Sequence, residues 1–221
     1  MIVVGIDPGV TGALALFSGG KLEEIVDMPV FATRADGAEL AQILERWWPD
    51  TVYLEDVHAM PKNGSVATFK LGLNTGIVIG IVQAAHIPLR RVSPQVWKRA
   101  TGVSGKPKDA ARGLCTELYP QHASKFRRVS DDGRADAVLI GRYGVYDQIR
   151  ETNEQSSATD RAASGEAVGA DVGRARHPAG RAGNDQRPDP GESGRGEGIA
   201  EVRPFVRPRR PRGGAEPGEA G

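Results

Sequence analysis

The apolar and polar positions at the start of the chain predict three consecutive strands. Residues 2–6 are apolar or small and end at Asp7, and a short apolar run of this kind is typical of a buried strand. Turns that contain Pro and Gly separate this run from two further runs of strand character, at residues 13–17 and 21–28. We therefore expect an antiparallel meander in which Asp7 lies near the middle of a sheet. A carboxylate there is costly to bury unless a positive group holds it.

The chain then alternates between helical and strand patterns up to about residue 146. Apolar residues recur at three- and four-residue spacing in segments that are typical of helices, and two short apolar runs between them are typical of strands. The helices are predicted at residues 36–48, 65–86, 93–99, 108–118 and 132–146, and the strands at residues 51–55 and 87–92. A strand that is reached through a helix is expected to be parallel to the preceding one. The pattern therefore predicts an α/β fold, in which helices cover a mixed five-stranded sheet.

The helix predicted over residues 65–86 carries a stripe of glycines at every fourth position, namely Gly72, Gly76 and Gly80. Each glycine destabilises a helix by roughly 1 kcal/mol relative to alanine, so the stripe suggests close approach to another backbone. Two interpretations remain open, which are contact with a second copy of the chain and tight packing on the sheet. Lys70 interrupts the apolar run, which argues against a membrane span.

Composition divides the 221-residue chain into two parts. Residues 151–221 contain 13 Gly, 7 Pro and 11 Arg but no Lys, and only six of their side chains are large and apolar. Such a segment cannot bury enough apolar surface to offset the entropy of folding. We therefore predict a folded domain over residues 1–147 and a disordered Gly/Pro/Arg-rich tail over residues 148–221. A nucleic-acid-binding arm and translation of an unrelated reading frame are alternative interpretations of the tail.

Net charge and cysteine content narrow the function only slightly. A formal net charge of +1 neither requires nor excludes a nucleic-acid partner. The single cysteine, Cys115, cannot form an internal disulfide, which fits a reducing compartment. The N-terminal apolar run is too short for a signal peptide or a membrane span. We expect a cytoplasmic protein without a membrane partner.

Three acidic residues stand where the pattern predicts buried positions. Asp7 ends the first strand, Glu55 ends the fourth, and Asp136 lies among small and apolar residues of the last helix, one turn after Asp132. If the first and fourth strands are parallel neighbours, Asp7 and Glu55 lie side by side. Clustered carboxylates repel one another unless a cation binds, and oxygen ligands without Cys or His favour Mg²⁺ or Mn²⁺. Two such ions roughly 4 Å apart would clamp the attacking water and the leaving oxygen of a phosphodiester.

Each acid also has a simpler interpretation. Asp7 can cap its own turn, Glu55 can face solvent at the end of a strand, and Asp136 can be an ordinary surface acid of its helix. Asp132, or its neighbour Asp131, can be the N-cap of the last helix. The combination of these acids on these elements favours the metal site over the separate interpretations.

Four segments of the chain resemble the RuvC-type Holliday-junction resolvases of the RNase H-like superfamily, and most closely the short versions carried by phages and prophages. The segments are Ile6-Asp7-Pro8-Gly9-Val10-Thr11-Gly12, Leu54-Glu55-Asp56-Val57-His58-Ala59-Met60-Pro61, Ser93-Pro94-Gln95-Val96-Trp97-Lys98 and Asp132-Gly133-Arg134-Ala135-Asp136-Ala137. The first motif alone recurs in several RNase H-like families, whereas its combination with the other segments is specific. The resemblance covers residues 1–147. It implies an RNase H-like fold, with a five-stranded mixed sheet of order 3-2-1-4-5 and helices on both faces.

The resemblance also implies an activity. RuvC-type resolvases are homodimeric, two-metal endodeoxyribonucleases that cut four-way DNA junctions in recombination and repair, so two Mg²⁺ or Mn²⁺ ions per active site are expected. Asp7, Glu55 and Asp136 match the metal-binding acids of the family. The family's fourth metal ligand, an Asp or His, usually stands three residues before the last Asp. That position is Gly133 in this chain, and Asp132, one residue earlier, is the candidate for its role.

Basic residues and one histidine near these motifs are candidate DNA contacts. Lys98 and Lys108 match family positions beside the scissile phosphate, and His58 stands where cellular members place an aromatic residue that stacks on junction bases. The remaining candidates, Lys62, Lys70 and Arg99, add positive charge that would bind phosphates in a salt-dependent manner. A solvated surface is the alternative for all of them. Two other functions stay open, namely a junction-binding protein without cleavage activity and an RNase H-like nuclease for RNA–DNA hybrids.

Overall fold

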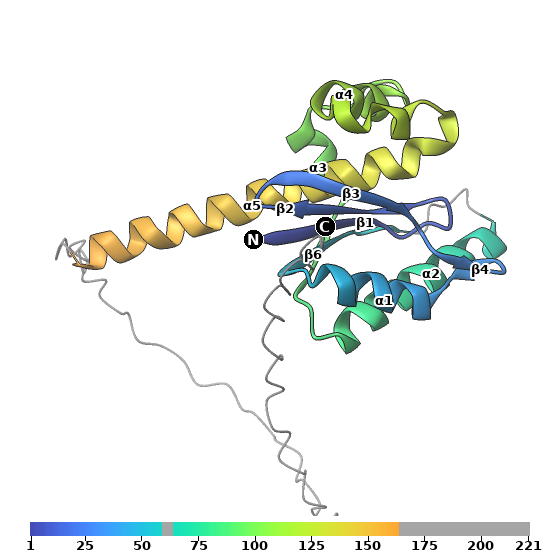
Figure 1. Cartoon of the computed structure of the whole chain (residues 1–221), viewed down its shortest axis with the longest axis horizontal. Helices are drawn as coiled ribbons and strands as arrows, with labels where there is room; N and C mark the ends of the chain where they lie inside the picture. The colour runs from blue at the N-terminus through green and yellow to red at the C-terminus, as the bar shows by residue number, and fades with distance from the viewer. Residues whose placement is uncertain (59–63, 164–221) are drawn as a thin grey trace, which may run out of the picture. The chain divides into compact units, whose positions relative to one another are not determined.

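A computed structural model of the chain describes residues 1–58 and 64–163, and residues Met1–Ser157 form one compact unit (Figure 1). The centre of this unit is a five-stranded sheet of order β3-β2-β1-β6-β7. The strands are β1 (Ile2–Asp7), β2 (Ala13–Ser18), β3 (Lys21–Asp27), β6 (Thr51–Glu55) and β7 (Leu89–Val92). β1, β2 and β3 form an antiparallel meander, while β6 is parallel to both β1 and β7. The predicted RNase H-like order 3-2-1-4-5 is thereby confirmed, because β6 and β7 are the fourth and fifth strands of this sheet.

Helices cover both faces of the sheet, as expected from the sequence. In Figure 1, α1 and α2 lie on one side of the strands, and α5 crosses the other side with α3 and α4 beyond it. Their bounds are α1 Gly37–Trp47, α2 Ser65–Ala84, α3 Pro94–Thr101, α4 Ala110–Leu118 and α5 Asp132–Ala163. Alternate residues of the central strand pack on opposite faces of the sheet. Val4 belongs to the buried cluster under α1 and α2, whereas Val3 belongs to the cluster under α5.

Close contact between α5 and the sheet depends on glycines in both elements. A Cβ atom on Gly5 of β1 would lie 2.2 Å from the backbone nitrogen of Gly141, and one on Gly144 would lie 2.4 Å from the ring of Tyr53. Neither position can therefore hold a larger residue without displacing the helix. The contact fixes α5 directly over β1 and β6.

The glycines of the α2 stripe lack the close neighbours that tight packing on the sheet would give them. A Cβ atom on Gly72, Gly76 or Gly80 would meet no described atom within 4 Å. The interpretation that these glycines let α2 pack tightly on the sheet is therefore wrong for the described part of the chain. Their face of α2 is open to solvent in this unit.

Several short elements lie where the sequence predicts only loops or irregular structure. They are β4 (Val30–Phe31), β5 (Arg34–Ala35) and the 3₁₀ helices η1 (Pro120–Phe126) and η2 (Val129–Asp131). The small β4–β5 hairpin is joined to α2, because the backbone N–H of Ala35 donates a 2.7 Å hydrogen bond to the buried Oδ1 of Asn74. A contact between residues 39 positions apart has no local signal in the sequence.

Helix α5 continues well past its predicted end at residue 146. Residues 148–163 are helical, so the prediction of a disordered tail from residue 148 is wrong for this part. The extension has few apolar side chains, and ion pairs from the edge strand hold it instead, since Arg90 of β7 bonds to Asp147 and to Glu151. Residues 164–221 lie outside the described residues, and the two-part division of the chain stays a prediction.

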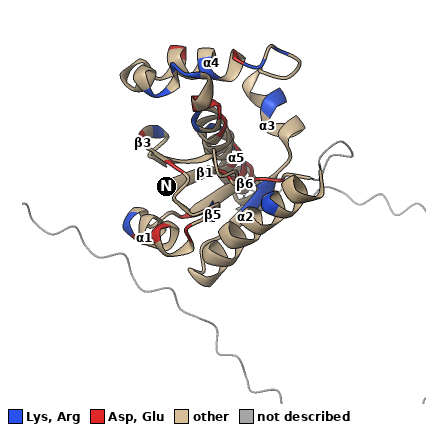
Figure 2. Cartoon of the chain, turned by 90° about the vertical axis from the view of Figure 1, so that its right-hand side faces the viewer, with Lys and Arg blue, Asp and Glu red and all other residues tan. Residues whose placement is uncertain are grey.

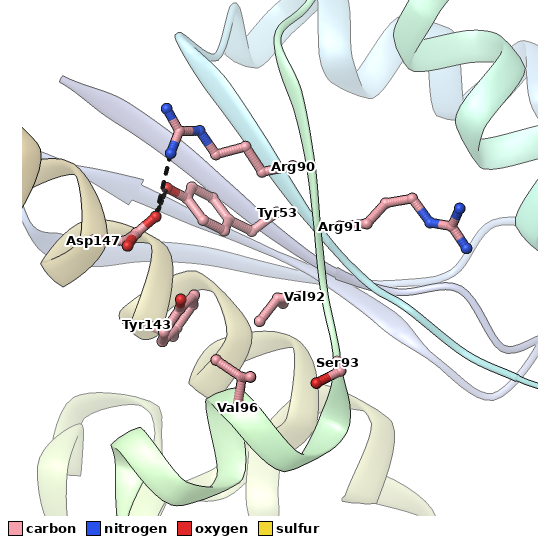
Figure 3. Close-up of a pocket in the computed structure, with 8 residues that line it drawn as sticks. All are labelled: Tyr53, Arg90, Arg91, Val92, Ser93, Val96, Tyr143 and Asp147. Atoms are coloured by element: carbon pink, nitrogen blue, oxygen red, sulfur yellow. Dashed lines mark hydrogen bonds and ion pairs between the residues drawn. The ribbon is translucent and has the colours of Figure 1, made fainter. Parts of the chain in front are cut away.

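Arg90 and Asp147 also line a hollow of about 480 Å³ between the edge strand and α5. In Figure 3 Arg90 points toward Asp147 and the hydroxyl of Tyr53, whereas Arg91 points away from them. The Tyr53 hydroxyl donates to Asp147 at 2.8 Å, and burial raises the pKa of Tyr53 well above its ordinary value. The pair of Arg90 with Asp147 joins the edge strand to α5 and so stabilises the position of α5 on the sheet.

Candidate active site

The pairing of β1 with β6 brings two of the predicted acids to the same edge of the sheet. The two strands are parallel, with Ile6 opposite Leu54, and the next residue of each strand is an acid, Asp7 and Glu55. Glu55 is only 8% exposed, so the interpretation of a solvent-facing acid is wrong. Asp7 does cap its own turn, because its Oδ1 accepts a hydrogen bond from the Gly9 N–H at 3.1 Å.

Helix α5 adds the third acid, Asp136, one turn before the close contact of Gly141 with Gly5. The structure describes Asp136 as partly buried, with fully buried neighbours at Ala135 and Ala137. It is therefore not an ordinary surface acid of the helix. Asp7, Glu55 and Asp136, which we call the carboxylate cluster, thus come from three elements that are far apart in the sequence.

Burial and repulsion between its members raise pKa values in the carboxylate cluster. Burial is the main cause that raises the pKa of Glu55, and repulsion from Asp7 adds to it. Burial and then the charges of Asp7, Glu55 and Asp132 raise the pKa of Asp136 to about 7, against the opposing effect of Lys98. Burial also raises the pKa of Asp7. Such mutual repulsion is the property that a bound cation would relieve.

Helix α3 contributes two side chains that face the carboxylate cluster. The indole Nε1 of the fully buried Trp97 donates a 3.1 Å hydrogen bond to Oε1 of Glu55, and this orients the carboxylate. The ammonium of Lys98 lies 5.0 Å from the centre of the Trp97 ring. Its positive charge partly offsets the rise that burial causes in the pKa of all three acids. The sequence gives no role to Trp97, although a buried indole normally needs a hydrogen-bond partner.

Asp132, the predicted fourth ligand, has a different partner. Its Oδ1 accepts a 2.7 Å hydrogen bond from Nε of Arg112 on α4, and the two side chains form an ion pair. Gly133, the position where the family has its fourth acid, has no room for a side chain, because a Cβ atom there would lie 2.2 Å from the Thr11 carbonyl oxygen. Arg112 is a second residue that sequence reasoning missed.

The donor atoms of the carboxylate cluster indicate which kind of metal ion it could bind. Three carboxylates with no Cys or His among them are the oxygen donors that Mg²⁺ and Mn²⁺ prefer. In residues 1–58 and 64–163, no ion pair within 4.0 Å joins Asp7, Glu55 or Asp136 to a basic side chain. Over the same residues, no three His, Cys, Asp or Glu side chains are already gathered in metal-binding geometry. The donor chemistry therefore fits a hard divalent cation, and the carboxylates would have to draw together around it.

A basic hollow of about 260 Å³ adjoins the carboxylate cluster. Its charged lining residues are Lys98, Lys106, Lys108, Asp132 and Asp136. Figure 2 shows basic segments on α3 and α4 and acidic segments along α5. A hollow with ammonium groups beside carboxylates can hold a phosphate next to a metal-binding group.

The other predicted DNA contacts are more scattered. Arg99 and Lys70 are exposed on α3 and α2. His58 is also exposed, and its Nε2 lies 3.6 Å from Oδ2 of Asp56, which in turn pairs with Arg91. Lys62 lies outside the described residues. Arg99, Lys70 and His58 do not line the basic hollow, whose lysines come from α3 and the loop after it.

The sheet topology and the cluster together define the class of protein, an RNase H-like domain with acidic residues at one sheet edge. Within this class, 94 residues of the chain are 29% identical to the chloroplastic Holliday junction resolvase MOC1 of Chlamydomonas reinhardtii. The match covers 42% of this chain, and the chain spans only 11% of the relative's length. No family model matches the chain. The resemblance to Holliday junction resolvases is confirmed by this match, and the likeness to phage versions stays a prediction.

Three solved structures are also similar to the chain. Thermus thermophilus RuvC with a Holliday junction substrate is 21% identical, with a TM-score of 0.49 over 67% of this chain and 96% of that one. A second T. thermophilus RuvC structure is 20% identical, with a TM-score of 0.48 over 66% and 96%. Yeast mitochondrial resolvase Ydc2 is 15% identical, with a TM-score of 0.44 over 63% and 75%. At these scores, the assignment of the fold depends on the strand order of the chain itself.

Proposed function

We propose that this chain is a metal-dependent, structure-specific endodeoxyribonuclease that cuts four-way DNA junctions. The observation that carries the proposal is the carboxylate cluster at one sheet edge, with the basic hollow beside it. The similarity to a chloroplastic Holliday junction resolvase supports branched DNA as the substrate. A role in recombination and repair follows from that substrate class, and a cytoplasmic location stays part of the proposal.

The residues of the cluster would divide the work as follows. Asp7, Glu55 and Asp136 would hold Mg²⁺ or Mn²⁺, which supplies Lewis-acid activation of the attacking water and of the phosphodiester. Trp97 fixes the orientation of Glu55 through its hydrogen bond. Lys98 offers a positive charge to the phosphate and to the developing charge on the leaving oxygen. Lys108 on the rim of the hollow would bind the neighbouring backbone phosphate.

A homodimer is part of the proposal, and α2 is its expected interface. Val66 and Phe69 are 67% and 70% exposed, and Leu73 is 38% exposed. The helix is also long and apolar enough to cross a membrane by length and composition alone, although a single helix of this kind is weak evidence for a membrane span. Its buried Asn74 is bonded to Ala35 of the same compact unit, which favours a protein partner for the exposed face.

The decisive experiment is cleavage of a synthetic four-way junction with and without Mg²⁺ or Mn²⁺. Asp7→Asn is expected to lower the nicking rate by about 10³-fold, because loss of a metal ligand removes several kcal/mol of transition-state stabilisation. Junction binding in a gel-shift assay should survive. Asp109→Asn, an exposed acid at the start of α4, is the matched control and should cleave normally.

The same assay separates the alternatives. A protein that only binds junctions would shift the DNA without nicking it under any metal condition. An RNase H-like hybrid nuclease would prefer an RNA–DNA duplex over the junction in direct competition. Normal cleavage by Asp7→Asn would refute the assignment of the carboxylate cluster as the catalytic site.

A further inference from the structure

We propose that Arg112 is a positioning residue that keeps Asp132 out of the metal-binding group, so that only Asp7, Glu55 and Asp136 ligate the metal. This inference rests on the proposed function and deepens it, because it states which acids of this chain serve the site. It replaces the expectation that Asp132 takes the place of the family's fourth ligand.

The first support is the geometry of the ion pair. Nε of Arg112 lies 2.7 Å from Oδ1 of Asp132, a length typical of a charge-assisted hydrogen bond. The side chains are 16% and 28% exposed, so solvent screens the pair only in part. If Asp132 turned to a metal ion, the guanidinium of Arg112 would be left without its partner in a mostly buried position, which is unfavourable.

The second support is the contact of α5 with the turn after β1. A Cβ atom on Gly133 would lie 2.2 Å from the Thr11 carbonyl oxygen and 2.8 Å from Cα of Gly12. The start of α5 is thus pressed against this turn, and no side chain can extend from position 133 toward the cluster. The family's usual source of a fourth acid is closed in this chain by backbone packing.

The third support is the contrast between the four acids. Asp132 has a cation within hydrogen-bond distance, whereas no ion pair is present for Asp7, Glu55 or Asp136 in the part of the chain that the structure describes. Asp132 lines the basic hollow beside Asp136, but its carboxylate is paired with Arg112 of α4. An incoming cation would therefore be drawn to the three acids that lack one.

Titration calorimetry of the full chain with Mn²⁺ tests the inference. Asp132→Asn is expected to bind Mn²⁺ with a dissociation constant within about 2-fold of the wild-type value. Asp136→Asn removes a ligand and should weaken binding by at least the roughly 10- to 100-fold that loss of a mere supporting group costs a metal site. An equal loss in the two variants would overturn the proposal.

Arg112→Gln tests the positioning role itself. Release of Asp132 should tighten Mn²⁺ binding by about 10-fold, or add an ion to the stoichiometry, and the double variant Arg112→Gln/Asp132→Asn should return to the wild-type value. An unchanged dissociation constant in folded Arg112→Gln would refute the role of Arg112. If this variant fails to fold by circular dichroism, Asp132→Asn alone decides the question.

The outcomes also distinguish this inference from the proposed function. If the wild-type chain binds Mn²⁺ and cuts junctions but Asp132→Asn loses Mn²⁺, only the inference fails. If the wild-type chain neither binds Mn²⁺ nor cuts junctions, the proposed function fails and the inference fails with it.

Discussion

Gly5 of β1 and Gly141 of α5 are in direct backbone contact, and this contact carries Asp136 to the edge of the sheet where Asp7 lies. A Cβ atom on Gly5 would be 2.2 Å from the Gly141 nitrogen and 2.3 Å from the Ala137 carbonyl oxygen. Since Asp136 precedes Ala137, any displacement of α5 from β1 also displaces this acid. The site therefore depends on two residues that have no side chain.

Substitution of Gly141 by Ala is expected to disturb both the fold and the site. The added methyl would lie 2.6 Å from the ring of Phe17, and overpacking of this kind destabilises a core by about 1–3 kcal/mol. Thermal unfolding should show the loss, and Mn²⁺ affinity should fall because Asp136 moves. Gly113→Ala in α4 is the control, since a Cβ atom there meets no described atom within 4 Å. A wild-type melting temperature in Gly141→Ala would contradict the importance of this contact.

Sheet order and the three acids were predictable because each has a local signal. An apolar run that ends in an acid marks β1, and parallel pairing then places Glu55 beside Asp7. The roles of Trp97 and Arg112 were not predictable, because their partners lie 42 and 20 residues away in the sequence. The length of α5 was missed for the same reason, since its extension is held by ion pairs to β7 rather than by an apolar stripe.

The pH dependence of stability should reveal the raised pKa of Asp136 in the metal-free protein. Its pKa of about 7, caused first by burial and then by Asp7, exceeds its ordinary value of 3.8. The folded state therefore binds more protons than the unfolded state between about pH 4 and pH 7, and this group makes folding less favourable as the pH rises through that range. Asp136→Asn should remove the effect.

Thermal melts in the presence of EDTA measure this dependence. At pH 8, Asp136→Asn is expected to melt at a higher temperature than the wild type, by about 2–4 °C for each kcal/mol of unfolding free energy regained. At pH 4 the two melting temperatures should be close. Asp109→Asn serves again as the control and should follow the wild-type curve. If the wild type and Asp136→Asn show the same change in stability between pH 4 and pH 7, the raised pKa of Asp136 is contradicted.

Replacement of Trp97 by Phe tests whether its indole supports the site. The change keeps a buried aromatic ring but removes the N–H that donates to Glu55. Loss of a supporting hydrogen bond typically weakens metal binding by about 10- to 100-fold, and leaving a buried acceptor unsatisfied destabilises by about 1–3 kcal/mol. Calorimetry with Mn²⁺ and thermal unfolding measure the two effects.

Trp47→Phe is the matched control for this variant. Trp47 also donates its Nε1 hydrogen to a glutamate, Glu24, at 2.8 Å, but this pair lies between α1 and β3. Its removal should lower stability without changing Mn²⁺ affinity. Equal Mn²⁺ affinities in Trp97→Phe and Trp47→Phe would reduce Trp97 to a structural role.

The exposed face of α2 predicts a concentration-dependent dimer. Phe69 is 70% exposed, and burial of such a side chain contributes about 1.5–3 kcal/mol. A symmetric interface contains Phe69 twice, so Phe69→Glu is expected to raise the dimer dissociation constant by at least about 100-fold. Sedimentation equilibrium measures this constant directly, and the monomer fold should be unchanged because the side chain is not part of the core.

Val129→Glu provides the comparison that makes the result specific to α2. Val129 is 73% exposed but belongs to η2, so the same loss of apolar surface occurs away from the expected interface. Its dimer dissociation constant should match that of the wild type. If both variants weaken association equally, general surface hydrophobicity is the cause, and if neither does, the dimer forms through another face. Only a selective effect of Phe69→Glu supports α2 as the interface, because only that result connects the open glycine stripe with contact between two copies.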